Sequence, residues 1–410
     1  MTLIQPFSGL RPAPDQAGEV AAPPYDVMSA AEARRMVEGR PWSFLHISRP
    51  EVDLPPGTDP YAPEVYAKAH ENLGRMLDQG LLIRDPQPSY YVYRLTMGGH
   101  RQTGLVAAAS VEAYDTDRIK KHEHTRPAKE DDRVRQIQAL GAQTGPVFLV
   151  YRAHAEIDAC LARVSGAEPE VDITAPDGVR HELWTLTDAG EIDLLTRAFD
   201  ALDALYVADG HHRSAAASRV AAQGRQEGRA KDQEQGFLAV IFPHDQMQIL
   251  DYNRVVRDLN GQSVADFLDR IRSAFEVKPS GTPVKPAAPA DFGMYLKGQW
   301  YLLRLDPRHI PAEDPVARLD VSLLQEHLIA PILDIGDPRR DDRIDFVGGI
   351  RGLEGLAARV DSGEMAVAFA LHPTRMEDLM AVADAGEVMP PKSTWFEPKL
   401  ADGLVSLVLD

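Results

Sequence analysis

The arrangement of apolar and polar residues along the chain predicts short strands that alternate with helices. Residues 89–114 contain two β-rich arms around Gly98 and Gly99, which is typical of a β-hairpin with a tight turn. Further strands are expected at 145–152, 364–373 and 403–410, and a strand pair at 292–305. Helices are expected to begin near Ser29 and to cover about 63–79, 127–141, 154–164, 320–333 and 374–386. This order predicts an α+β or mixed α/β fold, with mixed sheets and flanking helices.

One predicted strand-to-helix junction, LYVADGHHRSAAASRV at 205–220, carries a dense group of polar residues. Leu205 and Val207 predict a strand, and Gly210 permits a sharp turn or a close approach of a ligand to the backbone. The alanine-rich stretch that follows favours a helix. The pattern therefore places residues 211–213 in the first helical turn.

This junction has the chemistry of a phosphate site with an acid beside it. The unpaired N–H groups and the dipole of a helix start attract anions, and Arg213 adds a bidentate fork for phosphate oxygens beside Gly210. Asp209, at the strand end, is suited to hold Mg2+ or to accept a proton, and His211 and His212 are further catalytic candidates. The alternative is a helix start capped by Asp209, with two surface histidines.

A second polar cluster precedes and opens the helix expected at 127–141. The loop before this helix offers four polar side chains together, namely His122, Glu123, His124 and Thr125. On the helix, spacing of i, i+3, i+4 and i+7 gives one polar stripe of Lys129, Asp132, Arg133 and Gln136. Glu123 is a candidate base, and the others, Gln136 aside, are candidates for binding substrate or phosphate. For the stripe, a solvated face with ion pairs along the helix is the alternative.

The segment MPPKSTWFEPK at 389–399 predicts a stiff loop that presents cations and hydroxyls to an anion. Its candidates for phosphate binding are Lys392, Ser393, Thr394 and Lys399. Pro391 stands where a Walker loop requires glycine before its lysine, and proline supplies no N–H and cannot adopt a positive φ. A P-loop ATPase is therefore rejected, and a basic surface loop remains the alternative.

Length and charge narrow the classes of protein further. The 410 residues favour two or three packed units, and we expect domain ranges 1–155, 156–280 and 281–410, with the proline-rich segment 282–290 as a linker. The formal charge of -18 opposes binding to nucleic acid or to an anionic membrane. The single cysteine, Cys160, excludes disulfide frameworks and cysteine zinc sites. No signal pattern and no apolar run of about 20 residues occurs, so a cytoplasmic protein is expected.

The ADGHHR turn and the small-residue helix behind it resemble the signature of a widespread bacterial family of unknown function. Further motifs resemble that family in the same order: PPYDV (23–27), HEHTRPAKEDDR (122–133), GPVFLVY (145–151) and MPPKSTWFEPKLADGLV (389–405). The family is placed near the ParB/sulfiredoxin-like phosphate-binding fold, which includes free-serine kinases with an Asp-Gly-His-x-Arg turn. The resemblance covers nearly the whole chain. It implies such a core over 156–280, further α+β domains, and a C-terminal region that returns the MPPKST loop to the site.

These features together favour a phosphotransferase with an alcohol group as acceptor. The resemblance implies free L-serine as the leading acceptor, with pyrophosphate, ATP or ADP as donor and Mg2+ as cofactor. The expected partners are therefore a small-molecule substrate and a phosphate donor, and a homodimer is left open. Two other classes stay open: a ParB-like nucleotide-binding regulatory module, and a metal-dependent hydrolase that uses the four histidines at 122, 124, 211 and 212.

Overall fold

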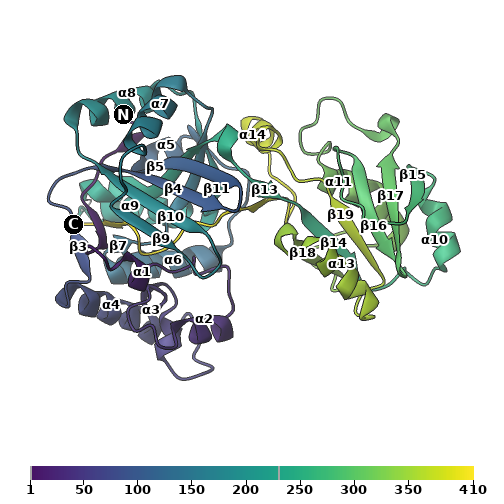
Figure 1. Ribbon diagram of the computed structural model, residues 1–410, viewed down its shortest axis with the longest axis horizontal. Coiled ribbons are helices and arrows are strands. Elements are labelled where there is room, and N and C mark those ends of the chain that lie inside the picture. Colours follow the sequence, from purple (N-terminus) through teal and green to yellow (C-terminus); the bar gives the residue numbers. More distant parts are fainter. Residues whose placement is uncertain (1, 230) are drawn as a thin grey trace. The chain divides into compact units, whose positions relative to one another are not determined.

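The structure is a computed structural model that describes residues 2–229 and 231–410 and divides into two compact units (Figure 1). Unit 1 comprises Met1–Met247 and Pro398–Asp410, and unit 2 comprises Gln248–Glu397. Both units combine mixed or antiparallel sheets with helices, so the predicted α+β class is confirmed.

A nine-stranded mixed sheet forms the centre of unit 1. In spatial order its strands are β6 (Ile119–Lys120), β11 (Leu205–Asp209), β8 (Val147–Tyr151), β12 (Gly236–Pro243), β5 (His100–Ser110), β4 (Tyr90–Met97), β10 (Arg180–Leu186) and β9 (Val171–Thr174), while β1 (Ile4–Gln5) pairs with β5. The β11–β6 and β12–β8 pairs are parallel, and the other pairs are antiparallel. The hairpin predicted around Gly98 and Gly99 is the β4–β5 pair.

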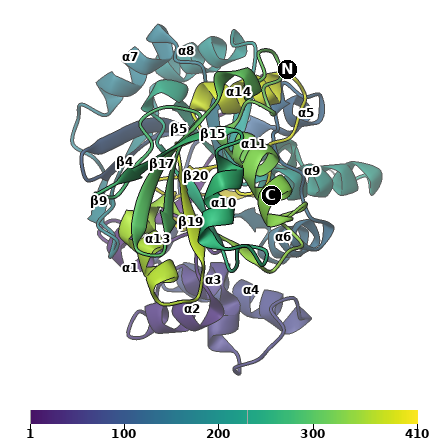
Figure 2. The same ribbon diagram turned by 90° about the vertical axis from the view of Figure 1, so that its right-hand side faces the viewer.

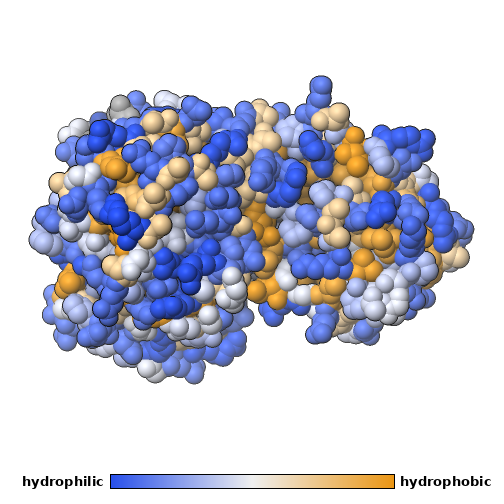
Figure 3. All heavy atoms as spheres, turned by 45° about the horizontal axis from the view of Figure 1, so that its top comes forward, coloured by the Kyte–Doolittle hydropathy of each residue, from blue (hydrophilic) through white to orange (hydrophobic). Residues whose placement is uncertain are grey.

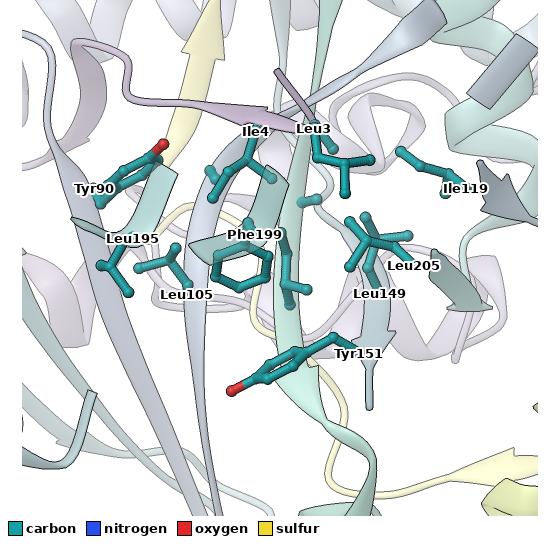
Figure 4. Close-up of a cluster of buried hydrophobic side chains, with 14 of the residues drawn as sticks. Leu3, Ile4, Tyr90, Leu105, Ile119, Leu149, Tyr151, Leu195, Phe199 and Leu205 are labelled. Atoms are coloured by element: carbon teal, nitrogen blue, oxygen red, sulfur yellow. The ribbon is translucent and has the colours of Figure 1, made fainter. Parts of the chain in front are cut away.

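Helices pack on this sheet and complete the main core of unit 1. They are α5 (Val111–Asp115), α7 (Ala155–Val164), α8 (Ala189–Asp200) and α9 (His211–Gln226), while α6 (Pro127–Leu140) packs against α9 and α4. Short 3-10 turns lie at Asp232–Gln235 and His244–Gln246. Figures 1 and 2 both show α7 and α8 side by side. Phe199 of α8 shares one buried cluster with Leu105, Leu149 and Leu205 of the sheet (Figure 4). Burying such side chains contributes about 1.5–3 kcal/mol each, so the core anchors β11 firmly.

A smaller four-stranded sheet and the N-terminal helices form a second core in unit 1. The strands, in spatial order, are β3 (Leu82–Arg84), β2 (Gly9–Pro12), β21 (Ser406–Val408) and β7 (Ala142–Gln143). The helices are α1 (Ala17–Val20), α2 (Ala30–Val37), α3 (Leu45–Ser48), a 3-10 turn at Pro50–Asp53, and α4 (Pro63–Asp78). Through β21 the segment that follows unit 2 in sequence returns to unit 1 and pairs with β2 and β7.

Unit 2 is a six-stranded antiparallel sheet with helices on both faces. In spatial order its strands are β15 (Phe275–Ser280), β17 (Gln299–Leu305), β16 (Asp291–Leu296), β19 (Val367–Leu371), β14 (Tyr252–Val256) and β18 (Ile344–Gly348), and a separate pair joins β13 (Ile249–Leu250) to β20 (Trp395–Phe396). The helices are α10 (Val264–Ile271), α11 (Asp320–Leu324), α12 (Ala330–Leu333), α13 (Gly352–Asp361) and α14 (Met376–Asp384), with a π-helical turn at Gln325–Ile329 and 3-10 turns at Pro307–His309 and Gly349–Arg351. Residues of β19 alternate between the two cores, Phe369 in one and Ala370 in the other.

Most helices lie where the sequence places them. Ser29 and Glu32 form the capping box of α2, Pro127 opens α6, and Gly141 ends α6 in the left-handed region. The helix expected at 320–333 is interrupted by the π-helical turn, just before Pro331, which cannot donate an N–H.

The chain division differs from the expected domain ranges. Strands from 1–155 and from 156–280 share the nine-stranded sheet, so these two ranges form one core. The segment 282–290 joins β15 to β16 inside unit 2, where the carbonyl of Val284 lies close to Gly293. On the face drawn in Figure 3, hydrophilic residues cover much of each unit. Among the described residues, no helix combines the length and the apolar character that crossing a bilayer requires.

Candidate active site

The predicted strand-to-helix junction is present in unit 1. Strand β11 ends at Asp209, Gly210 is the N-cap residue with φ 95° and ψ 26°, and α9 begins at His211. This backbone conformation favours glycine, and a Cβ at this position would lie 3.3 Å from both Arg213 Cζ and Val147 Cα. The prediction that residues 210–213 open a helix directly after a strand is confirmed.

Asp209 is held as a carboxylate at the end of β11. Its Oδ1 accepts the Gly210 N–H at 2.8 Å, and its Oδ2 lies 3.2 Å from the Lys399 ammonium. Burial alone would raise the pKa of this carboxyl group, but Lys399 and then Arg213 outweigh burial, so its pKa lies well below its usual value. The low pKa keeps Asp209 ionised at neutral pH, and the carboxylate is also accessible because 36% of its side chain stays exposed.

The loop before α6 is fixed to the first turn of α9 by histidines. The His122 and His211 rings meet edge to face with centroids 4.5 Å apart, and the Arg126 N–H donates to His212 Nε2 at 3.0 Å. Burial lowers the pKa of all three histidines, that of His122 to about 4. They are therefore neutral near pH 7 and can accept hydrogen bonds.

Arg213 is turned inward from the first turn of α9. One Nη donates to the carbonyl of Pro146, and the other lies 3.4 Å from Asp26 Oδ2. Tyr25 lies beneath the guanidinium, with its ring centroid 6.0 Å from Cζ. Burial opposes the charge, but Asp26 and Asp209 outweigh it and raise the pKa of Arg213. Its two Nη groups thus face partners inside the protein, whereas Nε has no partner among the described residues.

Three of the four residues in the polar stripe of α6 face inward as well. Asp132 accepts from Tyr66 Oη at 2.9 Å and pairs with Arg133 at 2.7 Å, and the Arg133 guanidinium lies 4.0 Å from the Tyr25 ring centroid. Gln136 is buried and donates to the carbonyl of Ile47 at 2.9 Å. The solvated-face alternative therefore fails for Asp132, Arg133 and Gln136, whereas Lys129 is exposed.

Two cavities lie beside this stripe. The smaller, of about 30 Å3, is lined by Tyr25, Ser48, Arg133, Gln136, Ile137, Ala142, Gln143, Thr144, Gly145, Arg213 and Asp402. The larger, of about 130 Å3, is lined by Tyr25, Ser48, Arg49, Pro50, Glu51, Pro60, Tyr61, Val65, Tyr66, Lys129, Asp132, Arg133 and Gln136. Four residues line both cavities, namely Tyr25, Ser48, Arg133 and Gln136.

The remaining predicted site residues divide between the two units. In unit 1, Glu123 is exposed and its carboxylate lies 3.8 Å from His211 Nδ1, Thr125 donates to Glu130, and His124 is exposed. In unit 2, the Lys392 carbonyl accepts from Arg254 at 3.0 Å.

The Ser393 hydroxyl of the predicted loop bonds within that loop. Ser393 is buried and its hydroxyl donates to the Pro390 carbonyl, while its own carbonyl accepts from Thr374 at 2.9 Å. The half-buried Thr394 follows it. The predicted 392–399 loop is therefore divided, since Lys399 belongs to unit 1 and residues 392–394 to unit 2.

Sequence reasoning missed Asp402, a buried carboxyl group in the lining of the smaller cavity. Burial raises its pKa to about 7, although Arg213 lowers it. The motif at 389–405 contains it in the run Lys-Leu-Ala-Asp-Gly, but spacing alone does not separate a site carboxylate from a turn residue. Tyr25 and Asp26, from the PPYDV motif, were likewise not among the predicted site residues.

The donor set bears on which metal the site could hold. The described residues include no group of three or more His, Cys, Asp or Glu side chains arranged to hold a metal ion. A structural or catalytic zinc ion requires three or four such ligands. Mg2+ takes one or two carboxylates and fills its other positions with water and substrate phosphate, so Asp209 alone is compatible with it.

Comparison with known proteins identifies the family. The family described as "Protein of unknown function (DUF1015)" matches residues 4–322. The chain belongs to DUF1015. No curated protein matches the DUF1015 chain described in this structure.

Solved structures show only a weak likeness to this DUF1015 member. Free serine kinase in complex with AMP has 14% identity and a TM-score of 0.33, covering 70% of this chain and 89% of that chain. A conserved hypothetical protein from Pyrococcus furiosus has 14% identity and a TM-score of 0.33, and the match covers 70% of this chain and 90% of that chain. SbnI with a C-terminal truncation, from Staphylococcus aureus, has 13% identity and a TM-score of 0.36, and the match covers 72% of this chain and 85% of that chain. TM-scores of this size support no statement about the activity of this chain, and the ParB/sulfiredoxin-like core stays a prediction.

Proposed function

We propose that this DUF1015 member is a phosphotransferase that moves a phosphoryl group to the hydroxyl of a small molecule at the junction of β11 and α9. The observation that carries the proposal is an accessible, ionised carboxylate, Asp209, placed directly before a helix start and 3.2 Å from the Lys399 ammonium. Phosphoryl transfer needs positioning and charge stabilisation more than covalent chemistry, and these groups supply both.

The donor phosphates would be held by the N–H groups of the first turn of α9 and by Lys399. A helix start offers unpaired N–H groups and the positive end of the helix dipole. Since the Nη groups of Arg213 face Pro146 and Asp26, we assign Arg213 a structural role beside the site. Its positive charge also attracts the donor phosphates.

Asp209 is the residue that would hold Mg2+. Bound there, the ion would neutralise charge on the donor phosphates and on the leaving group. The low pKa of Asp209 keeps it ionised at neutral pH, which suits a metal ligand better than a general base.

Free L-serine is the first acceptor to test. The Asp209–Arg213 turn resembles the Asp-Gly-His-x-Arg turn of free-serine kinases. A cavity of about 130 Å3, the size of a small polar molecule, shares four lining residues with the smaller cavity that Arg213 borders. The absence of a Walker loop in the sequence keeps pyrophosphate beside ATP and ADP as a donor.

The test is detection of O-phosphoserine by mass spectrometry. The purified full-length chain is incubated with L-serine and Mg2+, and with ATP, ADP or pyrophosphate in parallel. Phosphoserine with at least one donor supports the proposal. Binding of a nucleotide without product would favour the regulatory module instead. Stoichiometric zinc in the purified protein would favour the hydrolase.

A further inference from the structure

The smaller cavity of unit 1 is bordered by three buried polar atoms that lack partners. Ser48 Oγ, Arg213 Nε and Asp402 Oδ1 have no hydrogen-bond partner within the part of the chain that the structure describes. All three residues line the cavity, and their side chains are at least nine-tenths buried. Buried polar groups in folded proteins are nearly always hydrogen-bonded, so these atoms point to an occupant.

The three atoms specify the chemistry of that occupant. Arg213 Nε can only donate, an ionised Asp402 can only accept, and the Ser48 hydroxyl can do either. A single hydroxyl group satisfies the set, because its oxygen accepts from Arg213 while its proton is donated to Asp402. In place of the hydroxyl, an ammonium group would be repelled by the Arg213 cation, and a phosphate group would be repelled by the Asp402 carboxylate.

At about 30 Å3, this cavity has room for the hydroxyl end of a molecule and little more. It shares Tyr25, Ser48, Arg133 and Gln136 with the larger cavity of about 130 Å3. The larger cavity adds the Lys129 cation, so a carboxylate attached to the same small molecule has an ionic partner there.

Resting on the proposed function, we propose that the smaller cavity binds the hydroxyl end of the phosphoryl acceptor and that Asp402 is the general base of the transfer. The acceptor oxygen forms a bond to the donor phosphorus, and the bond between phosphorus and the leaving oxygen breaks, with its electron pair going to the leaving phosphate or nucleotide. The hydroxyl proton passes to Asp402 Oδ1. Asp209, on the donor side, keeps its separate role.

The surroundings of Asp402 support this division of roles. Arg213 from α9, Arg133 from α6 and Asp26 from the segment before α2 are the charged groups that face it, and the Tyr25 backbone donates a hydrogen bond to it. Burial dominates these contributions and brings the pKa of Asp402 to about 7, where a general base is most effective.

Gly145 allows the cavity to be filled without disturbing its walls. A Cβ added there would lie 3.4 Å from Arg213 Cδ and 3.6 Å from Asp402 Oδ1, which are ordinary contacts. Gly145→Ala therefore places a methyl group in the cavity. Gly74→Ala, in α4, where a Cβ meets nothing within 4 Å, is the matched control.

The experiment measures L-serine binding by calorimetry and phosphoserine formation in the full-length parent, Gly145→Ala, Gly74→Ala and Asp402→Asn. We expect Gly145→Ala to weaken L-serine binding at least tenfold while Gly74→Ala matches the parent. We expect Asp402→Asn to lower kcat by about 10²-fold or more, with little change in the Kd of the phosphate donor.

The outcomes separate this inference from the proposed function. If Gly145→Ala binds L-serine like the parent, the cavity holds an internal water only. If Asp402→Asn turns over at the parent rate, Asp402 is not the general base. If the parent binds L-serine and Gly145→Ala does not, but no donor gives product, the acceptor cavity stands while the phosphotransferase fails. Failure of the parent to bind L-serine, with or without a donor present, overturns the acceptor cavity.

Discussion

Asp209 and Asp402 are two carboxyl groups of unit 1 whose surroundings shift their pKa values in opposite directions. The Lys399 ammonium at 3.2 Å and the Arg213 cation outweigh the effect of burial on Asp209, so its pKa is lowered. Asp402 is fully buried with the Asp26 carboxylate nearby, so its pKa is raised to about 7. Pairs of acids whose environments separate their pKa values commonly have distinct roles in one site.

We expect Asp402→Asn to stabilise the protein above neutral pH. In the unfolded chain this carboxyl loses its proton near its usual pKa of 3.8, whereas in the folded chain it keeps the proton to about pH 7. Folding stability therefore falls as the pH rises from about 4 to about 7, and asparagine removes that loss. Thermal unfolding should give a Tm higher than the parent by about 3 °C or more at pH 8, with no gain at pH 4. An equal Tm at pH 8, or a gain also seen for the exposed Asp203→Asn, would contradict the raised pKa.

Arg213→Lys should destabilise unit 1 although it keeps the charge. Lysine cannot reproduce the planar arrangement that reaches the Pro146 carbonyl and Asp26 together. We expect a loss of about 1–3 kcal/mol in the free energy of unfolding, measured by chemical denaturation. Arg225→Lys, on the exposed part of α9, should cost less than about 0.5 kcal/mol. Similar losses for both variants would show that the buried contacts of Arg213 are not special.

The sequence identifies Asp209, Gly210 and Arg213 from local patterns and Lys399 from its residue type in a stiff loop, but it does not identify Asp402. Asp209, Gly210 and Arg213 lie within five positions, and strand and helix patterns on either side place them correctly. Asp402 reaches the site from nearly 200 residues further along the chain, through the pairing of β21 in the small sheet. No periodicity in one sequence reports such a contact, because it depends on tertiary packing.

Among the elements, the junction of the 122–126 loop with α9 depends on the protonation of a histidine. The Arg126 N–H donates to His212 Nε2, which can accept only while that nitrogen is unprotonated. Burial lowers the pKa of His212, so the bond persists at neutral pH and breaks only below the usual histidine range.

We therefore expect the Arg126 amide to keep its hydrogen-exchange protection at pH 6.5, the ordinary pKa of histidine, and to lose it at lower pH, after correction for the intrinsic exchange rate. His212→Gln offers a carbonyl oxygen at every pH and should remove this pH dependence. Protection that is constant from pH 7.5 to 5 in the parent would contradict the role of this hydrogen bond.

Element prediction succeeded where caps and turns are explicit in the sequence. Ser29 with Glu32, Pro127, and the Gly98-Gly99 pair each mark a boundary that the structure has. The segment 282–290 has the proline and alanine content of a linker, yet Pro286 and Ala290 are buried within unit 2. The proline content indicates a stiff segment, but it does not indicate whether that segment packs against the rest of unit 2.

At the scale of the whole molecule, unit 2 is an insertion within the chain of unit 1. Strands β13 and β20 pair antiparallel, with Ile249 opposite Phe396, and the Glu397 N–H donates to the Gln248 carbonyl at 3.1 Å. The segment that enters unit 2 and the segment that leaves it therefore lie side by side. Strand patterns alone could not reveal this, because the last strand of unit 1 follows unit 2 in sequence.

We expect unit 1 to fold without unit 2. A chain of residues 1–247 joined to 398–410 by a short glycine-serine linker retains both cores of unit 1 and Lys399. Circular dichroism should show one cooperative thermal transition, and the near-UV spectrum should show fixed aromatic packing. A chain without cooperative unfolding would show that unit 1 depends on unit 2.

The central claim is that phosphoryl transfer takes place at the junction of β11 and α9, and Asp209→Asn tests it most directly. This change keeps the size of the side chain and removes the charge that faces Lys399 and would hold Mg2+. With L-serine and the best donor, kcat for phosphoserine formation should fall by about 10²-fold or more, in part recovered by raised Mg2+, while the exposed Asp203→Asn matches the parent. Phosphoserine formation by Asp209→Asn at the parent rate would contradict the account.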